Sequence, residues 1–218
     1  MIPLRDSTRS RSSPIVVYLI IAACVAAFLY TAGLGSDRAR MGFYTLYGAI
    51  PRAITQGGWP AAWLSLLTSM FLHGSWLHLG GNMLYLWVFG DNVEDAMGHG
   101  GFLLFYMLTG VIAALAHVAT QPTSTEPLIG ASGAIAGVLG AYLVLYPRAR
   151  VTSLMILFPF IRLIDLPAVL VLSLWFLLQL YQGLATLGTS GVATVAFWAH
   201  VGGFIAGAVL VLIFARRR

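Results

Sequence analysis

The chain has 218 residues, of which 59% are hydrophobic and only 9% are charged, and its mean hydropathy is +0.88. Soluble globular domains carry about 25% charged residues, so this composition excludes a water-covered globule and indicates that lipid covers much of the surface. The net charge of +5 comes from arginines at the chain ends and between apolar runs, a placement typical of topology signals rather than of a nucleic-acid-binding stripe. The single cysteine, Cys24, excludes a disulfide framework and a cysteine-based metal site.

The N-terminal tail, residues 1–14, is rich in serine and arginine and is expected to be disordered. An apolar run follows it. This run is about 20 residues long, which is longer than the apolar core of a signal peptide, so we interpret it as a retained first span.

Six apolar runs approach the length of about 20 residues that a helix needs to cross the hydrocarbon core of a bilayer. They cover residues 15–34, 76–89 with an extension to 96, 102–120, 131–146, 163–183 and 192–215. The second and fourth runs are short and rich in glycine, which favours helices enclosed by their neighbours. The predicted fold is an all-α membrane protein, a bundle of six transmembrane helices over residues 15–215.

The segment from Met41 to Leu77 is neither a clean span nor an ordinary loop. It is dense in aromatic residues, and Pro51 and Pro60 interrupt it. Aromatic residues at this density favour the membrane–water interface. The sequence therefore predicts a membrane-associated first loop, made of short helices that lie partly in the outer leaflet.

An even number of spans puts both termini on one side, and the distribution of arginine indicates which side. Three arginines lie in the long first loop: Arg38, Arg40 and Arg52. The side of the termini carries Arg5, Arg9, Arg11, Arg148, Arg150, Arg162, Arg216, Arg217 and Arg218. The positive-inside rule therefore predicts that the tail over 1–14 and the basic end over 216–218 are cytoplasmic. The absence of lysine and the short tails fit a multi-pass protein of a bacterial plasma (inner) membrane.

Polar residues inside spans are costly, which makes them candidate functional residues. Runs two, four and six all cross from outside to inside, so their first turns share one level near the external face. These turns carry His78 and Asn82 on the second run, Ser132 on the fourth and His200 on the sixth. The sequence predicts that the four side chains meet just below the external surface.

Glycine patterns on two of these runs allow the helices to approach closely. Gly133 and Gly137 are four residues apart on the fourth run, as are Gly203 and Gly207 on the sixth. Close approach lets a hydroxyl and an imidazole on different helices come within about 2.6–3.2 Å, the separation of a nucleophile and its base.

We expect Ser132 to be a nucleophile that attacks a peptide carbonyl, with His200 as the base that takes its proton. Asp165 and Glu126 are poorly placed to orient His200, since the first is on the cytoplasmic side and the second is in a loop. The sequence therefore predicts a Ser–His dyad rather than a triad.

An oxyanion would form when the hydroxyl attacks the carbonyl. Its expected hydrogen-bond donors are the backbone N–H of Ser132, at the start of a helix, and the side chains of Asn82 and His78. Asn82 and His78 are four residues apart and share one helix face.

Three motifs follow one another on alternate spans: His73-x4-His78-x3-Asn82, Gly130-Ala-Ser132-Gly133 and Ala199-His200-x2-Gly203-x3-Gly207. In this order they resemble the rhomboid family of intramembrane serine proteases, of the six-span bacterial type, over roughly residues 63–210. The resemblance implies a Ser–His protease that cleaves transmembrane or membrane-proximal segments of other membrane proteins in the lipid bilayer. It implies no metal, no cofactor and no nucleic-acid partner.

The family's nucleophile, base and oxyanion-binding positions fall on Ser132, His200, Asn82 and His78. Glu94 resembles a family acidic residue of structural role. The membrane-lying first loop of the family would contain Trp59 and Trp63.

One position departs from the family pattern. Family members often carry an aromatic residue four positions after the nucleophile, stacked on the catalytic imidazole, whereas this chain has Ala136. Trp198 or a residue of the second run could take the place of that ring.

Other functions remain open from the sequence. A small transporter or pore would line a path with intramembrane polar residues, but these should then reach through the membrane rather than stop at one face. A non-catalytic member of such a family could bind transmembrane helices. A bis-histidine haem site is a weaker alternative, which a Soret band would reveal.

Overall fold

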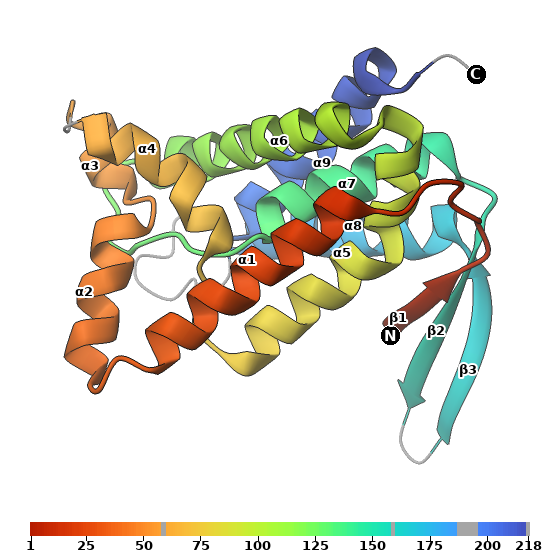
Figure 1. Ribbon diagram of the computed structural model, residues 1–218, viewed down its shortest axis with the longest axis horizontal. Helices are drawn as coiled ribbons and strands as arrows, with labels where there is room; N and C mark the ends of the chain where they lie inside the picture. The colour runs from red at the N-terminus through yellow and green to blue at the C-terminus, as the bar shows by residue number, and fades with distance from the viewer. Residues whose placement is uncertain (58–59, 158–159, 187–195, 217–218) are drawn as a thin grey trace.

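The computed structural model describes residues 1–57, 60–157, 160–186 and 196–216, most of which are helical. The helices are α1 (Ile15–Ala32), α2 (Asp37–Tyr47), α3 (Pro51–Thr55), α4 (Pro60–Thr68), α5 (Trp76–Met97), α6 (His99–Thr120), α7 (Ser132–Leu145), α8 (Ala168–Ala185) and α9 (Phe197–Phe214). A short 3-10 turn, η1 (Ser69–Phe71), follows α4. Three strands, β1 (Ile2–Asp6), β2 (Arg150–Leu157) and β3 (Phe160–Pro167), form an antiparallel sheet in the order β1-β2-β3 (Figure 1).

Four helices within the described ranges are long and apolar enough to cross a membrane: α1, α6, α8 and α9. α7 is apolar but has only 14 residues. α5 has 22 residues but carries three acidic side chains in its last two turns. The expected helical membrane bundle is confirmed, and the count of six spans stays a prediction.

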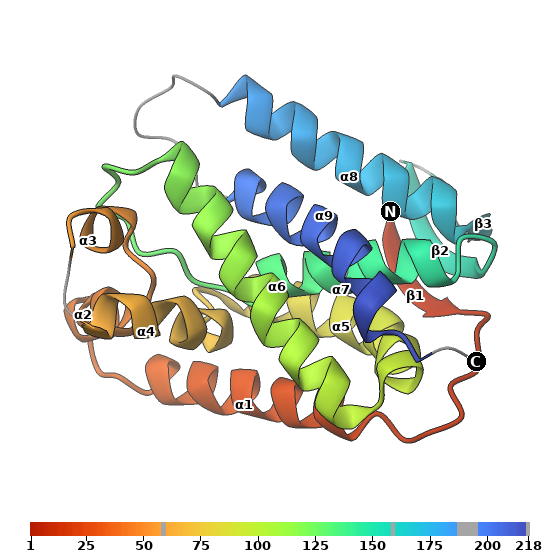
Figure 2. The ribbon, with the colours of Figure 1, turned by 90° about the horizontal axis from the view of Figure 1, so that it is seen from above.

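The long helices alternate in direction. α5, α7 and α9 begin at the end of the bundle where α2, α3 and α4 lie, whereas α1, α6 and α8 begin at the opposite end (Figures 1 and 2). The first turns of α5, α7 and α9 therefore share one level, as the order of the apolar runs predicts.

α7 lies at the centre of the bundle, and every residue from Gly133 to Tyr142 is buried. Glycine lets it approach α9 at backbone distance. A β-carbon on Gly203 would overlap the carbonyl oxygen of Gly133, and one on Gly207 would overlap that of Gly137. The close approach predicted from the glycine spacing is confirmed, and it fixes the separation of the two helices.

The fifth and sixth apolar runs begin later as helices than the sequence predicts. Residues 163–167 belong to β3, because the whole strand pairs with β2 from Arg150↔Pro167 to Leu157↔Phe160. Pro167 ends the strand and precedes the first turn of α8. The predicted start of the sixth run, residues 192–195, lies outside the described residues, and α9 begins at Phe197.

The N-terminal tail is ordered where the sequence predicts disorder, and this part of the prediction is wrong. Residues Ile2–Asp6 form β1, which pairs with β2. Ser10 then donates a hydrogen bond to Asp91 at 3.1 Å, and the Ser12 hydroxyl donates one to Asp95 at 2.7 Å. Composition alone misses this order because the partners lie about 80 to 150 residues away in the chain.

Glu94, near the end of α5, is fully buried and caps the N-terminus of α1. Its carboxylate accepts hydrogen bonds from the backbone N–H groups of Val16 and Val17, both at 2.9 Å, and lies 2.5 Å from His99 Nδ1. The first N–H groups of a helix have no partner within the helix, and Pro14 at the N-cap supplies none. Glu94 thus joins α1 to α5, which agrees with a structural role.

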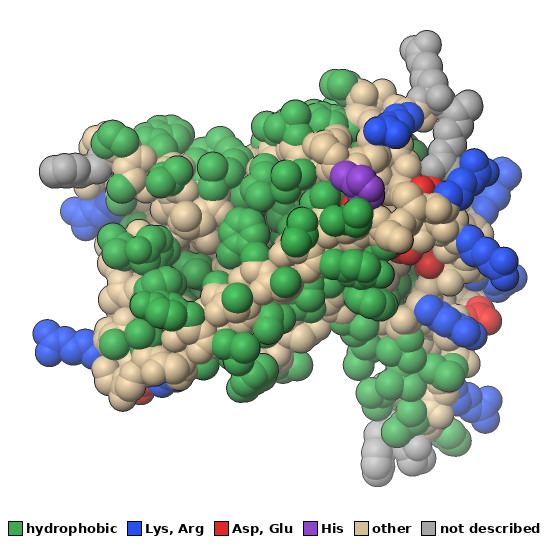
Figure 3. All heavy atoms as spheres, in the orientation of Figure 1, with side chains coloured by type: hydrophobic (Ala, Val, Ile, Leu, Met, Phe, Trp, Pro, Cys, Tyr) green, Lys and Arg blue, Asp and Glu red, His purple; other side chains and the backbone are tan. Residues whose placement is uncertain are grey.

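The surface carries its charges at the two ends. Figure 3 shows apolar side chains along the flank of the bundle and arginines at both ends, with more of them at the end of the sheet. The segment between α1 and α5 contains short helices, as expected, with Trp63 exposed on α4. Trp59 lies outside the described residues.

Candidate active site

Ser132 and His200 meet at the level of the first turns of α7 and α9. Ser132 is the first residue of α7, and His200 is the fourth residue of α9. The Ser132 Oγ lies 2.8 Å from the His200 Nε2. His200 is only 9% exposed, and Ser132 is half-buried. The separation is that of a nucleophile hydrogen-bonded to a base.

Gln179, on α8, contacts the other nitrogen of the same imidazole. Its Oε1 lies 2.7 Å from the His200 Nδ1, and its side chain is 8% exposed. Gln179 is not among the residues predicted from the sequence, where only an acidic side chain was expected as a possible partner of His200. A glutamine in the middle of an apolar span is itself a signal of a polar site.

Trp175, also on α8, supplies the ring that packs beside His200. The two ring centroids are 5.8 Å apart, with an angle of 35° between the planes. The ring therefore comes from neither of the expected sources, Trp198 and the second run. Ala136 is fully buried in α7. The aromatic neighbour of His200 thus comes from α8 and not from α7.

His78 and Ser132 border the same space. Gly130 has φ of +128°, and a β-carbon there would lie 2.8 Å from the His78 Nε2 and 3.7 Å from the Ser132 Oγ. Only glycine leaves this space open, both because of its φ and because of the approach of His78. The structure therefore brings His78 together with Ser132 and His200.

Asn82 lies one turn after His78 on α5 and is 8% exposed. Its Nδ2 has no hydrogen-bond partner among the described residues. The side chain makes no hydrogen bond to Ser132 or His200 within that part of the chain. A buried amide donor without a partner costs free energy, and a hydrogen bond from this Nδ2 to a ligand or a reaction intermediate would remove that cost.

The start of α7 offers backbone donors at the same place. Ile135 makes the first bond to Ala131 at 2.9 Å, and Ala131 at the N-cap gives no side-chain cap. The N–H groups of the first turn, including that of Ser132, therefore have no partner within the helix. They can stabilise negative charge beside the Ser132 hydroxyl.

Two further histidines lie near this level. His73 is fully buried, and its ring centroid is 5.0 Å from that of His78. His117, on α6, is 8% exposed. Within the described ranges, no three His, Cys, Asp or Glu side chains are grouped so that they could hold a metal ion.

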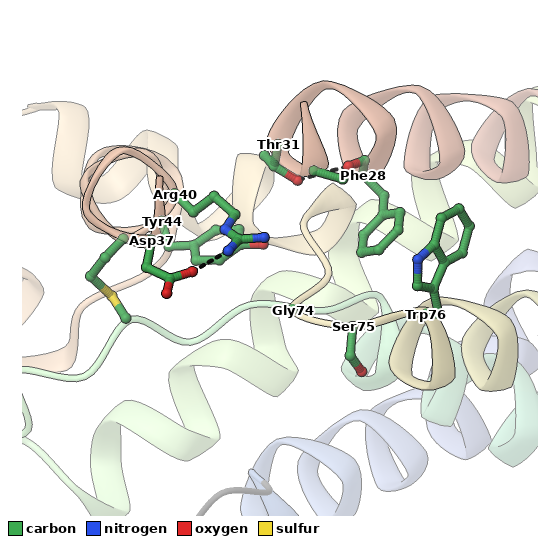
Figure 4. A pocket seen from close by; sticks show the side chains of 10 residues that line it. Phe28, Thr31, Asp37, Arg40, Tyr44, Gly74, Ser75 and Trp76 are labelled. Atoms are coloured by element: carbon green, nitrogen blue, oxygen red, sulfur yellow. Dashed lines mark hydrogen bonds and ion pairs between the residues drawn. The ribbon is translucent and has the colours of Figure 1, made fainter. Parts of the chain in front are cut away.

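A cavity of about 460 Å³ lies between the end of α1, α2 and the start of α5 (Figure 4). Phe28 and Trp76 line it with their rings edge to face and the ring centroids 4.6 Å apart, and Arg40 pairs with Asp37 beside it. Neither Ser132 nor His200 lines this cavity. It is separate from the group of residues described above.

Fold and site together define a multi-pass membrane protein with a Ser–His pair on adjacent helix starts. The chain belongs to the rhomboid family, since the family profile described as Rhomboid domain matches residues 60–217, most of its length. This confirms the family that the three motifs predict.

Several curated relatives are similar to parts of the chain. Rhomboid protease GluP of Bacillus subtilis is 35% identical over 130 residues, which are 60% of this chain and 24% of that protein. Rhomboid protein 1, mitochondrial, of Saccharomyces cerevisiae is 35% identical over 100 residues, 44% of this chain and 28% of that protein. Rhomboid-like protein 11, chloroplastic, of Arabidopsis thaliana is 29% identical over 160 residues, 71% of this chain and 54% of that protein. The matched parts are therefore between a quarter and about half of these relatives.

Proposed function

We propose that the chain is an intramembrane serine endopeptidase that cleaves transmembrane or membrane-proximal segments of other membrane proteins. The observation that carries the proposal is the 2.8 Å separation of the Ser132 Oγ and the His200 Nε2 inside a helical membrane bundle. Membership of a family that includes named proteases adds to it.

The reaction begins when His200 Nε2 takes the proton from the Ser132 hydroxyl as Oγ bonds to the substrate carbonyl carbon. The anionic oxygen receives hydrogen bonds from the Ser132 N–H, Asn82 and His78. His200 then gives its proton to the leaving amine, and the C–N bond breaks to leave an acyl-enzyme. Water attacks this ester and returns a proton through His200, which releases the acid product and restores Ser132.

Substrates of this site would need an unwound backbone at the point of cleavage. A helix hides its carbonyl groups in internal hydrogen bonds, so they are not open to attack. Glycine and proline weaken a helix by about 1 and 3 kcal/mol relative to alanine, so spans that contain them near one end are the expected targets.

We further propose that the protein lies in a plasma membrane with both termini cytoplasmic and the site near the external face. The greater number of arginines at the end of the sheet and termini supports this orientation. Relatives named as mitochondrial and chloroplastic show that the family also occurs in other membranes.

The test uses proteoliposomes that contain the protein and a tagged single-span protein. One version of the span has Gly and Pro near its external end, and a matched version has leucine at those positions. The wild type should cut the first and spare the second, whereas Ser132→Ala and His200→Ala should cut neither. If the span stayed uncut and bound equally to the wild type and to Ser132→Ala, the result would instead favour the non-catalytic helix-binding alternative.

A further inference from the structure

Two side chains of α8 contact the imidazole of His200, in addition to the Ser132 hydroxyl. Gln179 Oε1 lies 2.7 Å from Nδ1, and the Trp175 ring lies beside the imidazole with centroids 5.8 Å apart. Trp175 and Gln179 are four residues apart, so they project from one face of α8. α8 thus contacts the ring through both an acceptor and an aromatic surface.

An amide oxygen can only accept a hydrogen bond. With Gln179 Oε1 facing it, Nδ1 of His200 carries the hydrogen and donates it, and Nε2 keeps its lone pair toward the Ser132 hydroxyl. This tautomer is the one that a general base needs. The contact also fixes the ring plane, because one bond at Nδ1 and one at Nε2 leave no free rotation.

We propose that Gln179 is a positioning residue for His200, so that a hydrogen-bonded chain of Ser132, His200 and Gln179 takes the place of a bare dyad. The inference rests on the proposed function. It assigns Trp175 a supporting part, because an aromatic face stabilises the cationic imidazole that forms when the base accepts a proton.

A neutral partner suits this position. Gln179 is 8% exposed on a helix long and apolar enough to span a membrane, where an unpaired carboxylate would be costly. The titratable side chains that interact electrostatically with His200, within the described residues, are His78 on α5 and His117 on α6. Neither carries a negative charge. The amide dipole therefore favours the imidazolium without adding a net charge to the bundle.

The experiment measures covalent labelling by a fluorophosphonate probe, in which Ser132 Oγ bonds to phosphorus and fluoride leaves. Its rate is resolved into kinact and KI across the pH range. Gln179→Met keeps the length of the side chain and removes the acceptor. We expect kinact to fall about three- to tenfold, with KI unchanged. Gln182→Met, one turn along α8, is the matched control and should label like the wild type.

Gln179→Glu provides a second, independent reading. A carboxylate can also accept from Nδ1, so labelling should persist at neutral pH. Its charge favours the protonated imidazole, so the acidic limb of the pH–kinact profile should move upward by about one unit. A substitution that acted only through packing would leave the position of this limb unchanged.

Equal kinact for wild type and Gln179→Met, with both folded, would overturn the inference and leave the proposed function intact. So would a Gln179→Glu profile that coincides with that of the wild type, and this reading holds even if the Met variant unfolds. A folded wild type that the probe does not label would overturn the proposed function and the positioning role of Gln179 together.

Discussion

The proposed role of Asn82 in the reaction depends on its side-chain N–H group, which has no hydrogen-bond partner among the described residues. Asn82 is buried, and its Nδ2 has no partner among the described residues, so it can donate to an oxyanion without breaking another bond. Asn82→Ala should lower kcat about 10²- to 10³-fold with little change in KM. The measurement is steady-state cleavage of the tagged span in proteoliposomes.

Asn92 provides the matched control for this prediction. It is the other buried asparagine of α5, but its Nδ2 donates to Asp6 at 3.1 Å and to Asp91 at 2.8 Å, near the far end of the helix. Asn92→Ala should therefore lower thermal stability and leave kcat of the folded protein nearly unchanged. Equal losses of kcat in both variants would contradict the proposed role of Asn82.

Single residues also show what the sequence could and could not predict. Ser132, His200 and His78 were identifiable because polar groups stand out in apolar spans, and the direction of the spans puts them at one level. Gln179 and Trp175 were missed because their relation to His200 depends on how α8 rotates against α9. No sequence spacing encodes that rotation.

At the scale of elements, the contact of α7 with α9 sets the distance between nucleophile and base. Gly207→Ala would push its β-carbon against the carbonyl oxygen of Gly137 and separate the helices. We expect a loss of about 1–3 kcal/mol in stability and a clear loss of labelling at Ser132. Thermal unfolding in detergent and probe labelling measure the two effects.

Gly80→Ala tests whether this effect is specific. Gly80 lies in α5 with nothing within 4 Å of a β-carbon placed on it. Alanine there should be neutral or stabilise the helix by up to about 1 kcal/mol. If Gly207→Ala were as stable and active as Gly80→Ala, the close approach of α7 and α9 would not be what fixes the site.

Glu94 joins two elements through the start of α1. Glu94→Gln removes the charge and leaves one of the N–H groups of Val16 and Val17 without a matching acceptor. The expected loss is about 1.5–3 kcal/mol, seen as a lower unfolding temperature. Glu126→Gln, in an exposed loop, should leave that temperature unchanged. If the unfolding temperature of Glu94→Gln equalled that of the wild type, the proposed role of Glu94 in joining α1 to α5 would be refuted.

The boundaries of elements were predictable only in part. The ends of the first four apolar runs agree with those of α1, α5, α6 and α7 to within a few residues. In these four cases the apolar run and the helix end at nearly the same residue, so the hydropathy of the sequence locates the helix ends. The fifth run merged β3 with α8, since a strand and a helix of similar composition give one continuous apolar stretch.

At the scale of the whole molecule, the sheet ties the N-terminus to the bundle. The Asp6 carboxylate accepts hydrogen bonds from Asn92 and Tyr142, which lie on α5 and α7. The pairing of β1 with β2 was unpredictable because it joins residues about 150 positions apart in the chain. The helical bundle could be foreseen from composition, whereas the sheet could not.

The contact of Asp6 with α5 and α7, which we call the junction, should make the stability of the protein depend on pH. Burial raises the pKa of Asp6 above its ordinary value of 3.8, against the opposing effect of hydrogen bonds from Tyr142 and Thr8. A raised folded-state pKa means that the folded protein binds the proton more tightly than the unfolded chain does. The resulting stabilisation is present below the ordinary value and is lost as pH rises through the folded pKa.

Asp6→Asn removes that dependence. The unfolding temperature of the wild type relative to Asp6→Asn should therefore fall as pH increases from about 4 toward neutrality. Parallel thermal unfolding of both proteins at several pH values measures the difference. A difference that stays constant over this range would show that the burial of Asp6 does not control the junction.

The most direct test of the central claim is to locate a covalent adduct. The purified protein in detergent is incubated with a fluorophosphonate, digested and examined by mass spectrometry, beside Ser132→Ala and His200→Ala. We predict one adduct on Ser132 in the wild type and none in either variant. A folded wild type without this adduct, or a His200→Ala variant that keeps it, would contradict the assignment of Ser132 as a nucleophile activated by His200.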